Sequence, residues 1–300
     1  MGPRALVAHG GCAEDCTVRV AALFAAVAAL AALAAGADGA RSTERSLGAF
    51  RGTGTWISIY DRTARRRPAE VAARLREYGI DTLFLQTSND RQRRAVAHPV
   101  ATARLLDAAH DAGARVVGWY VPGFRSPRRD VEHALAGARF RSPRGDGFDA
   151  FALDVESTEV RSLATRSARA VAVARRVRAG LPVGLALGAI SIDPAGARYW
   201  DGYPFAGLAR SVDVFLPMEY FTYRARGATR VGGYSRRDVA LVRRLAGDPA
   251  FPVHPIGGVA RAATLPELRA FLRVNRREIG VSLWEYGETS VTELALLAAR

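Results

Sequence analysis

The chain has 300 residues, 49% of them hydrophobic, which is enough to bury one large core of the size found in a barrel or a doubly wound sheet. The formal net charge is +14, and every one of the 43 basic residues is arginine. Because alanine is also abundant, this charge indicates GC-rich coding rather than nucleic-acid binding, and no helix-turn-helix, zinc or RNA-binding signature occurs. We therefore expect no nucleic-acid partner.

Residues 1–37 have the features of a secretory signal peptide. Arg19 precedes the apolar run 20–35, and Ala35-Gly36-Ala37 offers a cleavage site of the A-x-A kind. An uncleaved anchor is the alternative, although the run is short and alanine-rich for a membrane span of about 20 residues. Both cysteines precede the run, so the mature chain would contain none. We expect a secreted protein, extracellular or cell-wall associated, with no stable membrane insertion after cleavage.

After a polar segment over residues 38–53, apolar runs alternate with amphipathic runs to the end of the chain. The apolar runs predict eight strands, at residues 55–60, 82–87, 115–121, 148–156, 182–189, 213–221, 251–257 and 280–286. The amphipathic runs include helices expected at residues 68–78, 100–112, 161–179, 235–246 and 266–276.

Residues typical of helix ends support these helices. Two prolines, Pro68 and Pro266, stand at first-turn positions, and Ser235 stands at an N-cap position. Glycines stand at the C-terminal ends, namely Gly79, Gly113 and Gly180. Eight strand and helix units over residues 54–300 predict a single-domain α/β fold, the (β/α)8 TIM barrel. A doubly wound sheet is the alternative, but neither a G-x-G-x-x-G loop nor a P-loop is present.

The fourth strand, within FDAFALDVES at residues 148–157, ends in two acids. Alternation places Asp154 and Glu156 on one face and Phe151, Leu153 and Val155 on the other. Burying two like charges destabilises a fold by several kcal/mol unless they are paired, and each raises the pKa of the other. The pair therefore indicates chemistry, the alternative being a structural pair held by arginine or backbone donors.

Active sites of such barrels form at the carboxyl ends of the strands. The other candidate substrate-binding residues there are Asp61, Gln86, Trp119, Tyr120, Met218, Glu219, Tyr220 and Trp284. No free cysteine, paired histidine or nucleophile elbow accompanies them, so we expect no metal, no cofactor and no thiol, zinc or serine hydrolase. Acids beside aromatic rings suit glycoside cleavage, with Glu156 as the acid and Asp154 as its electrostatic partner.

Two further acids at strand ends have less favourable positions. Glu219 lies between Met218 and Tyr220, and Glu285 follows Trp284. If the neighbouring residues point inward, alternation turns both acids toward the helices, where a solvated or arginine-paired carboxylate is expected. Glu219 remains a second carboxylate for the site only if its strand bends.

Residues 149–156, DAFALDVE, resemble the D-G-x-D-x-D-x-E signature of glycoside hydrolase family 18, the chitinase-like proteins. Met218-Glu219-Tyr220 is similar to the M-x-Y element of that family, and Trp284 falls where the family has a tryptophan beneath the sugar. The resemblance implies that Glu156 is the general acid, Asp154 orients the substrate acetamido group, Tyr220 binds its carbonyl and Trp284 forms the floor. It also implies that the substrate's own N-acetyl oxygen is the nucleophile.

The leading functional hypothesis is a secreted glycoside hydrolase that acts, as a monomer, on a poly- or oligosaccharide of the cell wall or the extracellular space. A catalytically silent carbohydrate-binding barrel is the alternative, because Ala152 stands where the family has its middle aspartate. A structural wall-associated protein that binds through its arginine surface is the third.

Overall fold

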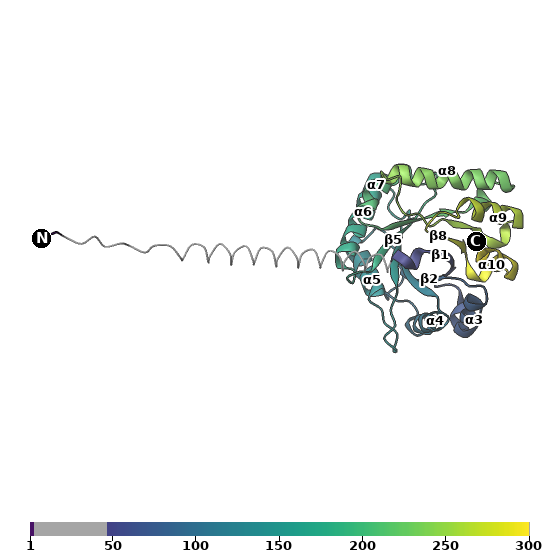
Figure 1. Ribbon diagram of the computed structural model, residues 1–300, viewed down its shortest axis with the longest axis horizontal. Coiled ribbons are helices and arrows are strands. Elements are labelled where there is room, and N and C mark those ends of the chain that lie inside the picture. Colours follow the sequence, from purple (N-terminus) through teal and green to yellow (C-terminus); the bar gives the residue numbers. More distant parts are fainter. Residues whose placement is uncertain (3–46, 300) are drawn as a thin grey trace. The chain divides into compact units, whose positions relative to one another are not determined.

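The computed structural model describes residues 1–2 and 47–299, so the expected signal peptide and most of the polar segment after it lie outside the described residues. Eight parallel strands close into a barrel in which each strand pairs with its neighbours in the sequence, and β1 pairs with β8. The helices surround the strands (Figure 1). This architecture confirms the predicted (β/α)8 barrel.

The strands match the predicted apolar runs closely in number and order. They are β1 (Gly52–Ile57), β2 (Thr82–Asn89), β3 (Arg115–Val121), β4 (Ala150–Asp154), β5 (Ala186–Ser191), β6 (Val214–Glu219), β7 (Ile256–Val259) and β8 (Gly280–Trp284). The fifth and seventh begin later than expected. Gly184 has a φ of +79°, and Pro255 has no N–H for a sheet hydrogen bond, so regular pairing starts after them.

The helices follow the strands in alternation. They are α2 (Arg62–Arg66), α3 (Pro68–Glu77), α4 (Pro99–Asp111), α5 (Pro127–Ala138), α6 (Leu163–Gly180), α7 (Phe205–Ala209), α8 (Ala228–Ala246), α9 (Leu265–Val274) and α10 (Val291–Ala298). The described residues also form four 3-10 turns: η1 (Gly48–Phe50), η2 (Phe221–Tyr223), η3 (Ala260–Ala262) and η4 (Tyr286–Glu288).

Most of the predicted helix ends are confirmed, with one clear exception. Pro68 and Pro266 lie in the first turns of α3 and α9, and Thr264 caps α9 together with Glu267. Ser235, in contrast, is not an N-cap. The helix α8 begins seven residues earlier, after Gly227 at a φ of +82°, and Ser235 is buried inside it. Among residues 47–299, no helix has the length and apolar character needed to cross a bilayer.

The barrel begins at η1, before the expected boundary at residue 54. The η1 residues are buried, and the Phe50 carbonyl oxygen lies 2.7 Å from His254 Nδ1. The ring of Phe50 packs beside Gly188 of β5, where an added Cβ would lie 3.0 Å from Phe50 and 2.8 Å from Leu216. Glycine is therefore the residue that this inner position accommodates. The last residues of the expected polar segment are thus part of the barrel interior.

Strand alternation divides the core into an inside and an outside. Ala150 and Ala152 of β4 belong to a cluster inside the barrel, together with Phe84 and Trp119. Phe151 and Leu153 point the other way and pack in the layer between strands and helices. The side chain that follows Ala152 on the inner face is Asp154, so the fold directs this acid into the barrel mouth.

Candidate active site

A cavity of about 470 Å³ opens at the carboxyl ends of the strands. Each of the eight strands contributes a lining side chain, namely Trp56, Gln86, Trp119, Asp154, Ile190, Met218, Ile256 and Trp284 in strand order. The residues that follow the strands add Ser58, Tyr60, Glu156, Tyr220 and Glu285, while Asn89 and Val121 come from the ends of β2 and β3. Seven of the predicted catalytic or substrate-binding residues therefore line one cavity. They are Gln86, Trp119, Asp154, Glu156, Met218, Tyr220 and Trp284.

The two acids of β4 share this cavity. Asp154, the last residue of the strand, is buried, and Glu156 is half-buried two residues further on. Burial raises the pKa of both carboxyl groups, and the charge of Glu156 raises that of Asp154 further. Among the described residues, Asp154 Oδ1 has no hydrogen-bond partner. Burial and the neighbouring charge thus favour the protonated form of the pair, which faces a space that a ligand can enter.

Three tryptophans form an aromatic floor in the cavity. The ring centroids of Trp56, Trp119 and Trp284 lie 5.7 to 6.1 Å from one another, at tilted or edge-on angles. Trp56 is held in place by stacking on Phe84 at 4.0 Å and by a 2.8 Å hydrogen bond from Nε1 to Ser282 Oγ. Trp119 Nε1 is buried without a partner among the described residues. The floor thus offers apolar rings and one free N–H donor to a ligand.

Tyr220 lies at the edge of this floor, with its ring 6.5 Å from that of Trp284. Burial raises the pKa of its hydroxyl well above the usual value, and the negative charges of Asp154, Glu156 and Glu285 raise it further. The phenol therefore stays protonated and remains a hydrogen-bond donor close to three carboxyl groups. Met218, two residues earlier on β6, lies below it in the inner cluster.

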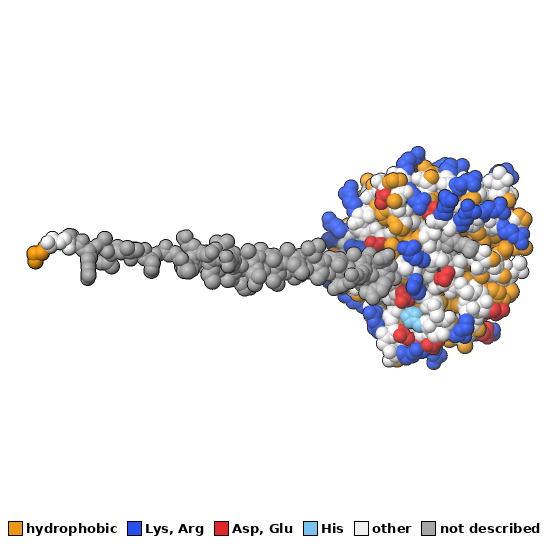
Figure 2. Space-filling model, viewed as in Figure 1, with side chains coloured by type: hydrophobic (Ala, Val, Ile, Leu, Met, Phe, Trp, Pro, Cys, Tyr) orange, Lys and Arg blue, Asp and Glu red, His pale blue; other side chains and the backbone are white. Residues whose placement is uncertain are grey.

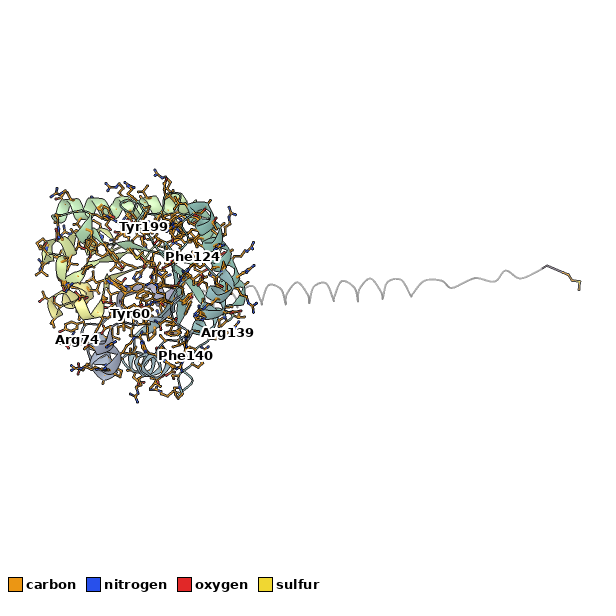
Figure 3. All side chains as sticks on the ribbon, turned by 180° about the vertical axis from the view of Figure 1, so that it is seen from behind. Tyr60, Arg74, Phe124, Arg139, Phe140 and Tyr199 are labelled. Carbon is orange, nitrogen blue, oxygen red and sulfur yellow. The ribbon has the colours of Figure 1, made fainter. Side chains whose placement is uncertain are left out.

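Gln86 lines the cavity, but its amide is engaged by the backbone. Its Oε1 accepts a 2.9 Å hydrogen bond from the N–H of Ile59, and its Nε2 donates to the Ser88 carbonyl at 3.3 Å. At the cavity edge Asn89 Nδ2 donates to the Tyr60 hydroxyl at 2.9 Å. Gln86 and Asn89 therefore fix the segment after β1, whose Tyr60 lines the cavity. Tyr60 is labelled in Figure 3.

Three residues expected to contact substrate do not line the cavity. Tyr120 follows the inward Trp119, so alternation turns it outward, where its hydroxyl donates to Asp130 at 2.9 Å. Asp61 accepts a 2.9 Å hydrogen bond from the Ala64 N–H and caps α2. Glu219 lies outside the barrel wall, fully buried against α8. Each of these side chains has a structural role in place of the expected sugar contact.

Glu285 is the acid that alternation placed wrongly. It lines the cavity because β8 ends at Trp284 and the chain turns at once into η4, so that the two-residue period no longer applies. The peptide bond between Trp284 and Glu285 is cis. Burial raises the pKa of Glu285, with a smaller contribution from Asp61, and its Oε2 has no partner among the described residues. It is a third carboxyl group in the cavity. Within residues 47–299, no group of three or more metal-ligating acid, histidine or cysteine side chains occurs.

Glu219 belongs to a buried network between β6 and α8. Ser235 Oγ donates to its carboxylate, and Asn275 Nδ2 donates to Ser235 Oγ at 2.7 Å. Burial raises the pKa of Glu219 well above its usual value, and the charge of Asp238 raises it further. Burial also raises the pKa of Asp238, to about 8. The acid is thus turned toward the helices, as alternation predicts, but is neither solvated nor paired with arginine.

This network should make stability pH-dependent. Both pKa values are raised by folding, so the folded chain keeps a proton that the unfolded chain releases above about pH 4, and the free energy of unfolding should decrease as the pH rises from there toward 8. We expect the free energy of unfolding, measured in urea titrations, to decrease by on the order of 2 kcal/mol between about pH 5 and pH 9. Glu219→Gln should flatten this dependence, whereas Glu132→Gln, an exposed acid on α5, should leave it unchanged. Parallel curves for Glu219→Gln and the wild type would contradict the assignment.

No protein-family model matches the sequence, and no curated protein does. Solved structures with the same architecture do match. The endo-β-1,4-mannanase of Thermotoga petrophila superposes with a TM-score of 0.63 at 11% identity, over 83% of this chain and 76% of that one. The spore cortex-lytic enzyme SleL of Bacillus cereus superposes with a TM-score of 0.59 at 11% identity, over 82% of this chain and 73% of that one. A chitinase from Bacteroides thetaiotaomicron superposes with a TM-score of 0.60 at 10% identity, over 83% of this chain and 94% of that one. The chain therefore has the barrel fold of these glycoside hydrolases.

Proposed function

We propose that the protein is a glycoside hydrolase that acts on an extracellular or cell-wall polysaccharide, with Glu156 as general acid and base and Asp154 as its electrostatic partner. The observation that carries this proposal is the coupled pair itself, two acids with raised pKa values that face an aromatic cavity at the barrel mouth. Fold alone does not give function, so the shared barrel adds only support.

The chemistry assigns a separate task to each group. Glu156, the more accessible acid, gives its proton to the glycosidic oxygen as the bond to the anomeric carbon breaks. Asp154, the more buried one, is ionised while Glu156 carries the proton, and its negative charge stabilises the positive charge that develops on the sugar. In the second half of the reaction, Glu156 takes a proton from the attacking water. The floor of Trp56, Trp119 and Trp284 orients the sugar by stacking.

Two nucleophiles are compatible with this cavity, and they require different substrates. If the sugar is N-acetylated, its acetamido oxygen attacks the anomeric carbon, and the protonated hydroxyl of Tyr220 holds that group. If the sugar lacks an N-acetyl group, a second protein carboxylate is needed, and Glu285 is the one that the cavity supplies. We favour the first scheme, since the family 18 resemblance rests on Asp154, Glu156 and Tyr220.

The test is release of reducing ends by the wild-type chain from chitin oligomers, peptidoglycan and a panel of neutral polysaccharides. We expect turnover on an N-acetylated substrate. Turnover confined to neutral glycans would transfer the nucleophile to Glu285, and Glu285→Gln should then abolish it. No release from any substrate by a folded chain would contradict the proposal.

The second candidate, a carbohydrate-binding barrel without turnover, has one specific observation in its favour. Ala152 is fully buried inside the barrel, at the position where the resembled family has an aspartate. Within residues 150–156, Glu156 is consequently the one acid beside Asp154. In such a protein the aromatic floor would bind sugar, and replacement of Glu156 would leave the affinity unchanged.

Secretion and a monomeric state are part of the proposal. The sequence of residues 1–37 supports export, and a polysaccharide outside the cell is the corresponding substrate. No cofactor is needed by either catalytic scheme, since protonation and attack are both assigned to protein or substrate groups.

A further inference from the structure

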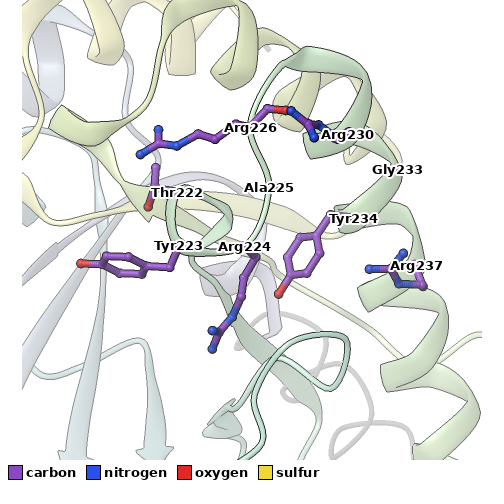
Figure 4. Close-up of a pocket in the computed structure, with 9 residues that line it drawn as sticks. All are labelled: Thr222, Tyr223, Arg224, Ala225, Arg226, Arg230, Gly233, Tyr234 and Arg237. Atoms are coloured by element: carbon purple, nitrogen blue, oxygen red, sulfur yellow. The ribbon is translucent and has the colours of Figure 1, made fainter.

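A second pocket, with a volume of about 610 Å³, lies where η2 meets α8 (Figure 4). Its charged and aromatic lining consists of Arg224, Arg226, Arg230, Arg237, Tyr223 and Tyr234. No acid is among the residues that line it. We refer to it as the arginine pocket. Arginine side chains are scattered over the visible face and lie along the edge formed by α8 (Figure 2), so the pocket needs an argument beyond charge.

Two of the four arginines, Arg230 and Arg237, form no ion pair with a described residue. Arg230 donates from Nε to the Arg226 carbonyl at 2.7 Å, and the guanidinium of Arg237 lies over the Tyr234 ring at 5.7 Å. Within residues 47–299, neither has a carboxylate within ion-pair distance. The guanidinium group has five N–H donors in a fixed fork that matches carboxylate and phosphate oxygens. Most of these donors at Arg230 and Arg237 remain available to a ligand.

The other two arginines are held by acids behind them. Arg224 Nε lies 3.5 Å from Asp193, and Arg226 lies 3.9 Å from Glu267 while donating to the Ala262 carbonyl at 2.8 Å. These contacts fix two walls of the pocket. Since only Arg224 and Arg226 are partly neutralised, the pocket as a whole keeps a positive charge.

The helix α8 provides the space between Arg230 and Arg237. Arg230, Gly233, Tyr234 and Arg237 follow the i, i+3, i+4, i+7 spacing of one helix face. At about 1.5 Å per residue, the two arginines are roughly 10 Å apart along the axis. Gly233 lies between them and contributes no side chain.

Two successive glycines in a helix are unfavourable, each by roughly 0.5–1 kcal/mol relative to alanine. Gly232 has a packing reason, because an added Cβ would lie 3.3 Å from Val274 of α9. Gly233 has none, since an added Cβ would meet nothing within 4 Å. Its effect in the fold is to leave the space between Arg230 and Arg237 without a side chain.

The arginine pocket is close to the catalytic cavity. Tyr220 lines the cavity, and Thr222 and Tyr223 of the following η2 line the arginine pocket. A 3-10 turn rises about 2 Å per residue, so these residues are separated by roughly 4–6 Å along the chain. The hydroxyl of Tyr199 is affected by charged groups of both sites. Burial raises its pKa most, the charges of Glu156 and Asp154 raise it further, and Arg224 lowers it. The two pockets are thus lined by residues of one short chain segment, 220–223.

We infer that the arginine pocket binds an anionic group, a carboxylate or a phosphate, carried by the same polysaccharide whose sugar ring occupies the catalytic cavity. The inference rests on the proposed function and narrows its substrate class to acidic polysaccharides. Charge selects this group through Arg230 and Arg237, and Gly233 makes the space for it.

The test measures binding by calorimetry to the full chain carrying Glu156→Gln, so that no turnover interferes. The probes are three forms of one N-acetylated hexasaccharide, chitohexaose: carboxylated, phosphorylated and unmodified, the last being the neutral probe. One of the anionic probes should bind at least roughly tenfold more tightly than the neutral one. Arg230→Gln with Arg237→Gln should remove this preference. So should Gly233→Leu, which fills the pocket without changing the charge.

The matched control is Arg104→Gln with Arg175→Gln, two exposed arginines of α4 and α6 that lie outside the pocket and produce the same loss of charge. It should keep the preference. Equal affinity for neutral and anionic probes would overturn the inference, as would an equal loss in the control pair or an unaffected Gly233→Leu variant. The better anionic probe identifies the group as carboxylate or phosphate. Failure of the proposed function would be seen separately, as absence of turnover by the wild type.

Discussion

Glu156→Gln is expected to reduce turnover by roughly 10²–10⁴-fold while leaving sugar affinity and the fold intact, because the amide keeps the shape of the carboxyl group and cannot donate an acidic proton. The measurement is kcat on the substrate found by reducing-end release, together with the Kd of an unreactive oligosaccharide. Burial raises the pKa of Glu156, so the wild-type acid is protonated over a wider range than an exposed glutamate.

The matched control for this variant is Glu132→Gln, which makes the same chemical change at an exposed residue of α5 that pairs with Arg128. It should retain full activity. A Glu156→Gln protein that kept most of its turnover would remove this residue from the mechanism. A protein with no turnover in the wild type, and equal sugar affinity in both forms, would be the silent barrel that Ala152 allows.

Asp154→Asn is expected to lower kcat/KM at neutral pH and to move the basic limb of its pH profile to lower pH. In the wild type, burial raises the pKa of both carboxyl groups, and the charge of Glu156 raises that of Asp154 further, which opposes loss of the last proton from the pair. Asparagine is neutral, so the remaining Glu156 is affected by burial alone and should lose its proton at lower pH. The loss should be on the order of 10²-fold near neutral pH, because a general acid works best with its pKa close to the working pH.

The pH profile separates this role from a packing role. If Asp154 only filled space, kcat/KM would fall equally at every pH and the limb would not move. Recovery of activity in the variant at lower pH is therefore the expected signature. An unshifted limb would contradict the coupling between Asp154 and Glu156.

The barrel could be predicted from the sequence because its signals are local. Each strand is a short apolar run, and each helix that follows carries an amphipathic period. The third strand was predicted with its observed ends, Arg115 and Val121. The same two-residue period placed Asp154 and Glu156 together, and the structure has both in one cavity.

The remainder of the site depends on contacts that a single sequence does not show. Trp56 was missed because the first strand was expected three residues too late, although it alternates with Ser58 on the inner face. Glu285 was misplaced because alternation was extended past the end of β8. The network of Glu219 with Ser235 joins a strand and a helix 16 residues apart, and the expected N-cap concealed it.

The aromatic floor gives the protein a built-in optical reporter. The chain has four tryptophans, and three of them, Trp56, Trp119 and Trp284, line the catalytic cavity. The fourth, Trp200, is buried elsewhere against Arg166 and Phe124. Three of the four tryptophan fluorophores thus lie beside the two acids, so we expect occupancy of the cavity to change the intrinsic fluorescence of the unlabelled protein without any chemical turnover.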